Sequence, residues 1–354
     1  MSRPIQAHIN LDALQHNLHR ARRLSSARIM AVIKADAYGH GLLRSAEALC
    51  DAEGFALLDL TDAVSLREAG FKQTILLLEG FFAAAELPLM AEYEIASVIH
   101  SPHQIDMLDA YPRRAALDVW LKINTGMNRL GFAPHELPAA MEKLQAHSAV
   151  RDITLMTHFS HADEATGIAA QLEKFNQITA AYRLPRSLAN SAALLRYPAS
   201  HADWVRPGIM LYGASPFPET SAQQLGLQSV MSLHSKIIAV RELNKGESIS
   251  YGGLFSAAHP MRVGVVACGY ADGYPRHAPS GTPILVAGQR TRILGRITMD
   301  MLCVDLTALP AVEVGSHVTL WGAGLPVEEI AHAAGTISYD LLCAITKRVP
   351  VVTR

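Results

Sequence analysis

The sequence has few cysteines, no long apolar run and no excess of charge of one sign. Its four cysteines are far apart and none lies in a CxxC pair, so neither a disulfide framework nor a cysteine metal site is indicated. The longest apolar runs fall well short of the roughly 20 residues that a membrane-spanning helix needs. The first residues lack the basic and apolar segments of a signal peptide. These absences predict a protein of the reducing cytoplasm with no membrane partner.

The charge balance argues against a nucleic-acid partner. Lysine and arginine number 31 against 32 acidic residues, and no basic run is present that would track a phosphate backbone. Half of the 354 residues are apolar, which is enough for a sizeable core. At roughly 150 residues per domain, this length predicts about two domains. The composition therefore favours an enzyme or binding protein for small molecules.

The first part of the chain alternates short apolar runs with amphipathic stretches. Strands that alternate with helices indicate a parallel sheet, and about eight repeats favour a (β/α)8 barrel of the TIM type over an open doubly wound sheet. The expected strands are Ile29–Ile33, Phe55–Leu58, Thr74–Leu78, Ile95–Ile99, Leu117–Ile123, Ile153–Thr157, Ser187–Ala189 and Trp204–Arg206.

The pattern changes near Gln228, after which β-type runs follow one another with turn residues between them. One late helix is predicted at Val327–Ala334, and it should end at Gly335. The expected domains are thus a barrel over residues 1–228 and a mainly β C-terminal domain over residues 229–354, with residues 215–221 as the linker.

Lys34 is the first candidate for chemistry. An apolar strand delivers this lysine at its C-terminal end, where a barrel carries its active site, and a loop with Gly39 and Gly41 follows. A lysine among apolar residues loses hydration, so its pKa falls and its amine can act as a nucleophile. Taken alone, the same residue also fits a lysine that ends a strand and reaches solvent.

The whole string from Lys34 to Gly41, KADAYGHG, resembles the cofactor-lysine motif of the bacterial alanine racemases, which depend on pyridoxal 5'-phosphate (PLP). Further motifs of that family follow in order along nearly the whole chain. They are KINTGMNRLG at residues 122–131, MTHF at 156–159, NS at 190–191, RPGIMLYG at 206–213, SYGG at 250–253, GYADGYPR at 269–276, RITMD at 296–300 and ISYD at 337–340. The family often has a cysteine where Thr298 stands.

The resemblance implies a role for each matching residue. Lys34 would bind PLP covalently, and Lys34 and Tyr251 would be the two catalytic bases. The residues implied to contact the cofactor are Tyr38, His158, Ser191, Arg206, Tyr339 and the amides of Gly208 and Ile209; those implied to contact substrate are Arg129, Tyr270 and the amides of Met127 and Met299. Lys122 matches a lysine that is often carbamylated in the family.

Racemisation removes a proton from one face of the substrate Cα and returns one to the other face. It therefore needs two acid–base groups on opposite sides of the cofactor, here Lys34 and Tyr251. A tyrosine hydroxyl has a pKa near 10 and becomes a base near neutrality only where donors or cations stabilise the phenolate. His158 and Arg206 would do so by the resemblance. In the family the tyrosine comes from the partner subunit, which implies a homodimer with a shared active site.

Arg206 also helps to distinguish a racemase from other PLP-dependent enzymes of the same architecture. Many PLP enzymes place a carboxylate beside the pyridine nitrogen, whereas an arginine stays charged and cannot accept that proton. This argues against a PLP-dependent decarboxylase of the same architecture. A racemase for larger amino acids stays open, whereas a barrel used only to carry PLP would lack the last 125 or so residues. No metal-ligand spacing such as HExxH is present. The implied function is the interconversion of L- and D-alanine, either to supply D-alanine for peptidoglycan or for alanine breakdown.

Overall fold

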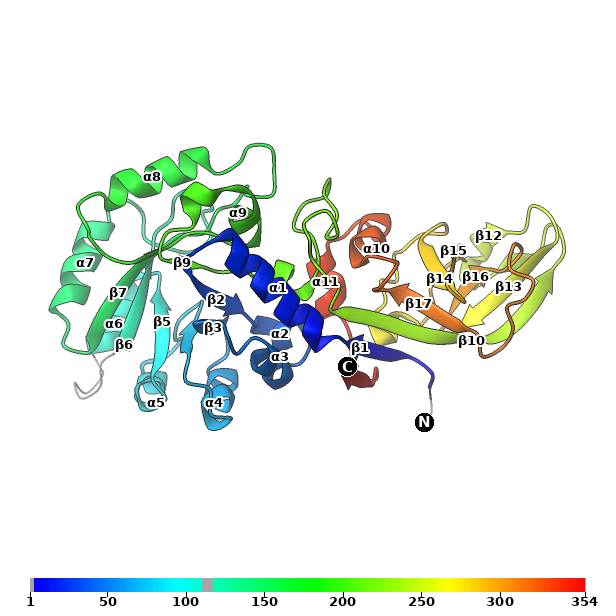
Figure 1. The fold of residues 1–354 in the computed structure, drawn as a ribbon, viewed down its shortest axis with the longest axis horizontal. Coiled ribbons are helices and arrows are strands. Elements are labelled where there is room, and N and C mark those ends of the chain that lie inside the picture. Colours follow the sequence, from blue (N-terminus) through cyan, green and yellow to red (C-terminus); the bar gives the residue numbers. More distant parts are fainter. Residues whose placement is uncertain (1–2, 110–116, 354) are drawn as a thin grey trace. The chain divides into compact units, whose positions relative to one another are not determined.

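The computed structural model describes residues 3–109 and 117–353 (Figure 1). The chain divides into two compact units. One contains Gln15–Ala37 and Gly41–Leu211, and the other contains Met1–Leu14, Tyr38–His40 and Tyr212–Arg354.

The first unit is a closed barrel of parallel strands, as the alternating pattern predicted. Its strands are β2 (Arg28–Val32), β3 (Gly54–Leu57), β4 (Thr74–Leu77), β5 (Ile95–Ile99), β6 (Leu117–Lys122), β7 (Val150–Met156), β8 (Arg186–Ser187) and β9 (Trp204–Val205). The register closes where β2 pairs with β9 through Arg28 and Trp204. Strands such as β5 are buried at every position, because side chains fill the barrel on one face and helices cover the other.

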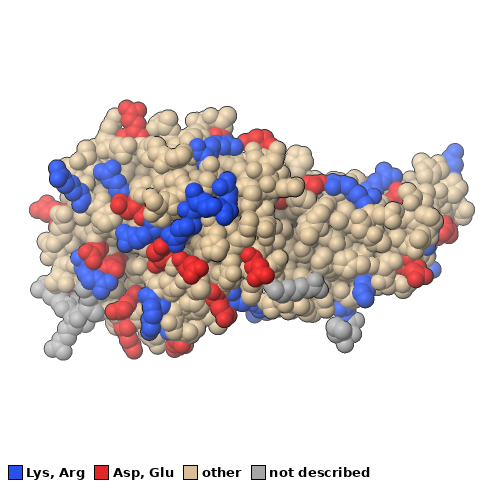
Figure 2. Space-filling model, in the orientation of Figure 1, with Lys and Arg blue, Asp and Glu red and all other residues tan. Residues whose placement is uncertain are grey.

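The helices of this unit lie outside the strands (Figure 1). From the start of the chain through this unit, the α-helices of the described residues are α1 (Leu11–Leu24), α2 (Lys34–Gly39), α3 (Leu42–Ala48), α4 (Leu60–Glu68), α5 (Leu87–Glu92), α6 (Pro102–Asp109), α7 (Leu137–Ala146), α8 (Ala169–Thr179) and α9 (Ser191–Arg196). Asp59 caps α4 by accepting from the backbone N–H groups of Thr61 and Asp62. Acidic and basic side chains are both present over the face drawn in Figure 2.

The second unit is mainly β, as predicted. Its strands are β1 (Gln6–Ile9), β10 (Met231–Leu243), β11 (Ser248–Ile249), β12 (Phe255–Ser256), β13 (Met261–Val266), β14 (Pro283–Val286), β15 (Gln289–Leu294), β16 (Leu302–Asp305), β17 (His317–Trp321) and β18 (Val351–Thr353). The long strand β10 pairs with both β17 and β13, so β10, β13, β16, β15, β14 and β17 form a closed circuit of pairings.

After β10, the described residues form two α-helices, α10 (Val327–Ala334) and α11 (Ser338–Cys343). Helix α10 ends at Gly335 in the left-handed conformation, with φ +68°, as the glycine predicted.

The sequence did not indicate the pairing of the two chain ends. Strand β1 pairs antiparallel with β10 and parallel with β18. The expected division at residue 228 stays a prediction, although residues 1–14 group with the mainly β unit.

Candidate active site

Lys34, two residues after the end of β2, opens a left-handed turn. The next four residues, Ala35 to Tyr38, have φ between +51° and +54°, a conformation that L-residues rarely adopt even singly. Hydrogen bonds hold the turn: Ala37 N donates to Ile33 O at 2.9 Å, and the Asp36 carboxylate accepts from Leu42 N at 2.7 Å. Such strain costs roughly 1 to 2 kcal/mol per residue and is typical of functional sites.

Four cations gather where the barrel strands end. Lys122 is the last residue of β6, and Arg206 directly follows β9. Burial, together with the positive charges of Arg206, Arg129 and Lys34, lowers the pKa of the Lys122 amine to about 8, although the charge of Glu79 opposes the shift. The sequence-predicted residues Lys34, Lys122, Arg129 and Arg206 therefore act on one another at one rim of the barrel.

The Arg206 guanidinium is buried and is held by uncharged oxygens. It donates to Ser187 Oγ at 2.6 Å, to Thr157 O at 2.7 Å and to Leu188 O at 3.3 Å. Burial lowers its pKa to about 10, so the group still carries its proton at neutral pH.

His158, two residues after β7, lies against this arginine. Arg206 Nη2 donates to His158 Nδ1 at 3.5 Å. Burial, followed by the charges of Arg206 and Lys122, lowers the pKa of the His158 ring well below its ordinary value. The ring is therefore neutral at pH 7, and with Nδ1 accepting, its proton is assigned to Nε2.

A buried network joins the loops that carry Arg129 and His158. The Gln171 side chain on α8 donates to Thr125 Oγ1 at 3.2 Å and accepts from Ser160 N at 2.9 Å. Thr125 Oγ1 in turn lies 2.8 Å from Thr157 Oγ1. Motif matching did not identify Gln171, because nothing local in the sequence shows what a helix residue meets.

A small cradle lies between the loops after β8 and β9. The buried Ser191 hydroxyl accepts from Gly208 N at 2.8 Å and from Met210 N at 3.5 Å. Ile209 is fully buried beside them. Hydroxyl and backbone N–H groups that converge at helix and loop starts form a site suited to an anion such as phosphate.

Tyr38 and Tyr339 come together in the mainly β unit. The Tyr38 ring stacks on Tyr212 at 4.6 Å between centroids and lies 6.0 Å from the Tyr339 ring. Burial, with a contribution from Tyr339, raises the pKa of the Tyr38 hydroxyl far above its usual value. Tyr38 therefore stays protonated and can only donate its proton as a hydrogen bond to an anion.

Tyr251 lies in a short turn after β11 rather than at the end of a strand. Ser250 before it has φ +64°, and its hydroxyl donates to Arg296 O at 2.7 Å, so the turn is anchored in a strained conformation. The Tyr251 side chain is nevertheless 72% exposed.

Tyr270 and Met299 are brought together by backbone hydrogen bonds. Tyr270 N donates to Thr298 O at 3.0 Å, and Ala271 N donates to Met299 O at 3.0 Å. Both side chains are exposed, and the Arg276 guanidinium lies 6.0 Å from the Tyr270 ring centroid.

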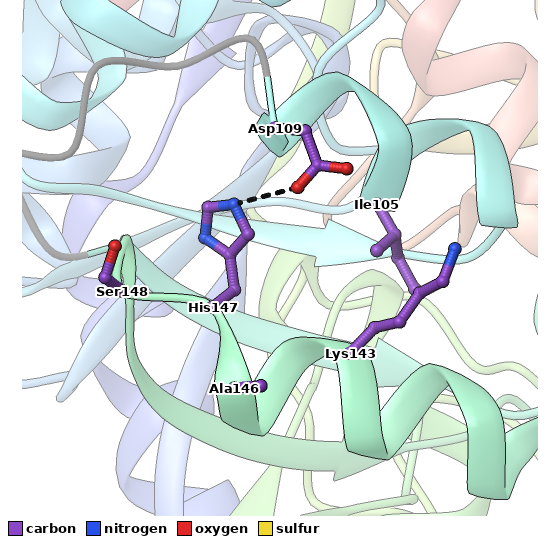
Figure 3. A pocket seen from close by; sticks show the side chains of 6 residues that line it. All are labelled: Ile105, Asp109, Lys143, Ala146, His147 and Ser148. Atoms are coloured by element: carbon purple, nitrogen blue, oxygen red, sulfur yellow. Dashed lines mark ion pairs between the residues drawn. The ribbon is translucent and has the colours of Figure 1, made fainter.

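A separate hollow of about 350 Å³ lies at the other rim of the barrel (Figure 3). It is lined by side chains that precede strands, and His147 Nε2 lies 3.5 Å from Asp109 Oδ1 across it. The candidate site residues of the barrel lie at or after the C-terminal ends of strands, so this hollow belongs to the opposite end.

Residues 3–109 and 117–353 contain no group of three or more His, Cys, Asp or Glu placed to hold a metal ion. Among the same residues, no helix has both the length and the apolar character to cross a bilayer.

Both units match known families. The family described as "Alanine racemase, N-terminal domain" matches residues 9–216, and that described as "Alanine racemase, C-terminal domain" matches residues 230–353. A curated alanine racemase of Nitrosospira multiformis is 61% identical, with all of both chains covered. That of Nitrosomonas europaea is 56% identical, over 100% of this chain and 99% of its own.

Solved structures agree with these matches. The crystal structure of the biosynthetic alanine racemase of Pseudomonas aeruginosa has a TM-score of 0.97 and 46% identity, covering 99% of each chain. The alanine racemase of Bacillus anthracis, solved with bound L-Ala-P, has a TM-score of 0.86 and 28% identity, covering 100% of this chain and 96% of its own.

Proposed function

The chain belongs to the alanine racemase family of isomerases and racemises alanine, and we propose that it does so with PLP and two bases, Lys34 and Tyr251, on opposite faces of the substrate Cα. The observation that carries this proposal is the cationic rim around Lys34, at the same end of the barrel strands as the cradle of Ser191 and Gly208.

The residues of the site fit PLP. The cradle of Ser191 Oγ with the amides of Gly208 and Ile209 would hold the phosphate, and the Tyr38 and Tyr339 hydroxyls would donate to it. The Lys34 amine would bind the cofactor covalently. When bound, PLP draws electrons away from the substrate Cα and makes its proton acidic.

The cationic rim also fits the charges of the ligands. Lys34, Lys122, Arg129 and Arg206 raise one another's electrostatic energy, and anions would relieve that repulsion. Arg129 would bind the substrate carboxylate and the phenolic oxygen of PLP, with the backbone amide of Met299 as a further donor. Lys122, as a carbamate, would pair with Arg129.

Arg206 and His158 would set the proton positions on the cofactor side. Arg206 keeps its proton and would donate a hydrogen bond to the pyridine nitrogen, which would therefore stay unprotonated. The neutral His158 accepts from Arg206 at Nδ1 and keeps Nε2–H to donate to a phenol oxygen. This series of hydrogen bonds, from Arg206 through His158 to the phenol, would stabilise the negative charge that Tyr251 develops when it gives up its proton.

Tyr251 would come from the partner subunit of a homodimer, and its high exposure in its own unit supports this arrangement. In one direction Tyr251 takes the Cα proton while Lys34 delivers one to the other face, and in the reverse direction the two exchange roles. Tyr270 would narrow the entrance and favour a methyl side chain.

The physiological setting follows from the reaction. We place the enzyme in the cytoplasm, where D-alanine would supply peptidoglycan synthesis or the same reaction would serve alanine breakdown. The similarity to the biosynthetic alanine racemase of P. aeruginosa favours the first role.

The two-base assignment is tested by isotope exchange. In deuterated water, the wild-type holoenzyme should exchange the Cα hydrogen of both enantiomers, as followed by proton NMR and a chiral assay. Tyr251→Phe should lose exchange with one enantiomer and keep it with the other, because only one face loses its base. Tyr93→Phe is the control, since the Tyr93 hydroxyl donates a hydrogen bond to Glu68 on the barrel surface, and Tyr93 is not among the proposed site residues. Equal loss for both enantiomers in Tyr251→Phe would contradict the proposal, and so would a wild type that binds no PLP.

A further inference from the structure

Four charged side chains form a cluster in the mainly β unit: Arg3, Asp272, Asp300 and Arg348. The Asp272 carboxylate is fully buried and accepts from Arg3 Nη1 at 2.9 Å and Arg3 Nη2 at 3.1 Å. Arg348 Nε lies 3.1 Å from the same carboxylate, and Arg348 Nη2 donates to Asp300 Oδ1 at 2.6 Å. Two positive and two negative charges therefore balance around one buried group.

The arginines come from the two ends of the chain. Arg3 precedes β1 and Arg348 precedes β18, while Asp272 lies 269 residues beyond Arg3. A planar guanidinium that donates two parallel hydrogen bonds fixes the direction of the carboxylate as well as its charge. Arg3 Nη2 also donates to Asp300 O at 2.8 Å, so one arginine joins two loops.

Those two loops carry Tyr270 and Met299. Asp272 ends the short turn Tyr270–Asp272, and its Oδ2 accepts from Gly269 N at 2.9 Å. A Cβ at Gly269 would lie 2.3 Å from Thr298 O, so the backbones of the two loops touch. Together with the hydrogen bonds from Tyr270 N and Ala271 N, this makes the two loops one assembly anchored on Asp272.

The segment after α11 is attached to the same assembly. Thr346 Oγ1 donates to Ala271 O at 2.8 Å, and Thr346 N donates to Asp272 O at 3.3 Å. A Cβ at Gly273 would lie 2.3 Å from Ala344 O. The loop with Tyr270 therefore cannot shift without disturbing the chain that leads from α11 to Arg348.

We propose that Asp272, held by Arg3 and Arg348, is a positioning residue that sets Tyr270 and Met299 against the substrate and thereby determines which amino acids are accepted. The side chains of Tyr270 and Met299 are 37% and 51% exposed, so packing alone holds them weakly, whereas their backbones are tied to a buried charge. The inference rests on the proposed contact of Tyr270 and Met299 with substrate.

The test compares Asp272→Asn with Asp305→Asn in the PLP-loaded enzyme. Both changes replace a carboxylate paired with arginine in the same unit by an amide of equal size, but Asp305 at the end of β16 pairs with Arg292 on β15 and holds neither loop. The steady-state kcat and KM are measured for L-alanine and L-serine, and the visible spectrum reports the fraction that holds PLP.

We expect Asp272→Asn to lower kcat/KM for alanine by on the order of 100-fold, mainly through KM, because a displacement near 1 Å has effects of this size. The preference for alanine over serine should fall as well, and Asp305→Asn should change neither. A variant with unchanged KM and unchanged preference overturns the proposal. So does a loss of kcat alone that follows the PLP-loaded fraction, since that is a purely structural effect.

Two further variants keep the outcomes distinct. Arg348→Lys keeps the positive charge but removes the planar guanidinium that reaches both Asp272 and Asp300. It should therefore shift KM and the preference for alanine in the same direction as Asp272→Asn but less strongly, and it can be measured even if Asp272→Asn does not fold. If it shifts neither, the proposal fails. Tyr270→Ala tests the premise. If this variant leaves KM and the preference for alanine unchanged, the proposed contact of Tyr270 with substrate is refuted. If it changes them while Asp272→Asn does not, only the positioning role of Asp272 is refuted.

Discussion

Lys122 should carry a carbamate in the purified enzyme, and this follows from its pKa. The pKa of about 8 means that about one amine in ten is neutral at pH 7, against about one in 2,500 for an ordinary lysine near 10.4. The neutral amine is the species that attacks the carbon of CO2. An N–C bond forms, a C=O electron pair moves to oxygen, and the nitrogen releases a proton to water. The roughly 250-fold gain in neutral amine favours this one lysine.

The carbamate would turn the repulsion between residue 122 and the neighbouring arginines into attraction. Lys122 is repelled by Arg206 and Arg129, whereas a carbamate at the same place would attract both. Arg129 would then be held by a negative partner, ready for the substrate carboxylate. We therefore expect enzyme depleted of bicarbonate to show a higher KM for alanine than enzyme supplied with it.

The assay is carbon-13 NMR in labelled bicarbonate. Wild-type enzyme should show one carbamate signal that Lys122→Met lacks and Lys143→Met keeps, since Lys143 is a surface lysine paired with Asp106. A wild type without the signal would refute this reasoning, and so would a signal that persists in Lys122→Met.

Two further predictions concern stability. Gly39→Ala should lower the free energy of unfolding by roughly 3 kcal/mol or more, because Gly39 has φ +78° and a Cβ would lie 2.3 Å from Leu342 O. Gly70→Ala, with φ +93° and open space, should lose only about 1 kcal/mol, and equal losses in urea unfolding would contradict the steric argument. As pH falls below about 6.5, His158 should become protonated in the unfolded chain before it does in the folded one. The free energy of unfolding should therefore decrease as the pH is lowered. Urea unfolding between about pH 5 and 7.5 should show a flatter pH dependence in His158→Asn than in the wild type, and parallel curves would exclude the effect.

Much of the barrel could be predicted because its signals are local. Each buried parallel strand is a short continuous apolar run, and the expected Ile95–Ile99 is β5 as observed. The end of α10 at Gly335 was equally readable, since a glycine in the left-handed conformation closes a helix within one turn.

The candidate site was predictable as motifs, and its supporting residues were not. Lys34, Arg129 and His158 follow strands at positions that the motif match marked. Gln171, which ties their loops together from α8, carries no such mark, because a glutamine in a helix is ordinarily a surface residue.

The sequence by itself determined the elements and the residues available for chemistry, since periodicity, strand ends and turn glycines act over a few positions. Only the tertiary structure decided which distant groups meet. Arg3 reaches Asp272 because β1 pairs with β10 and β18, and that register depends on the packing of the whole unit. The pKa values of Lys122 and His158 were likewise set by the fold, because burial and the approach of Arg206 exist only once the barrel has closed.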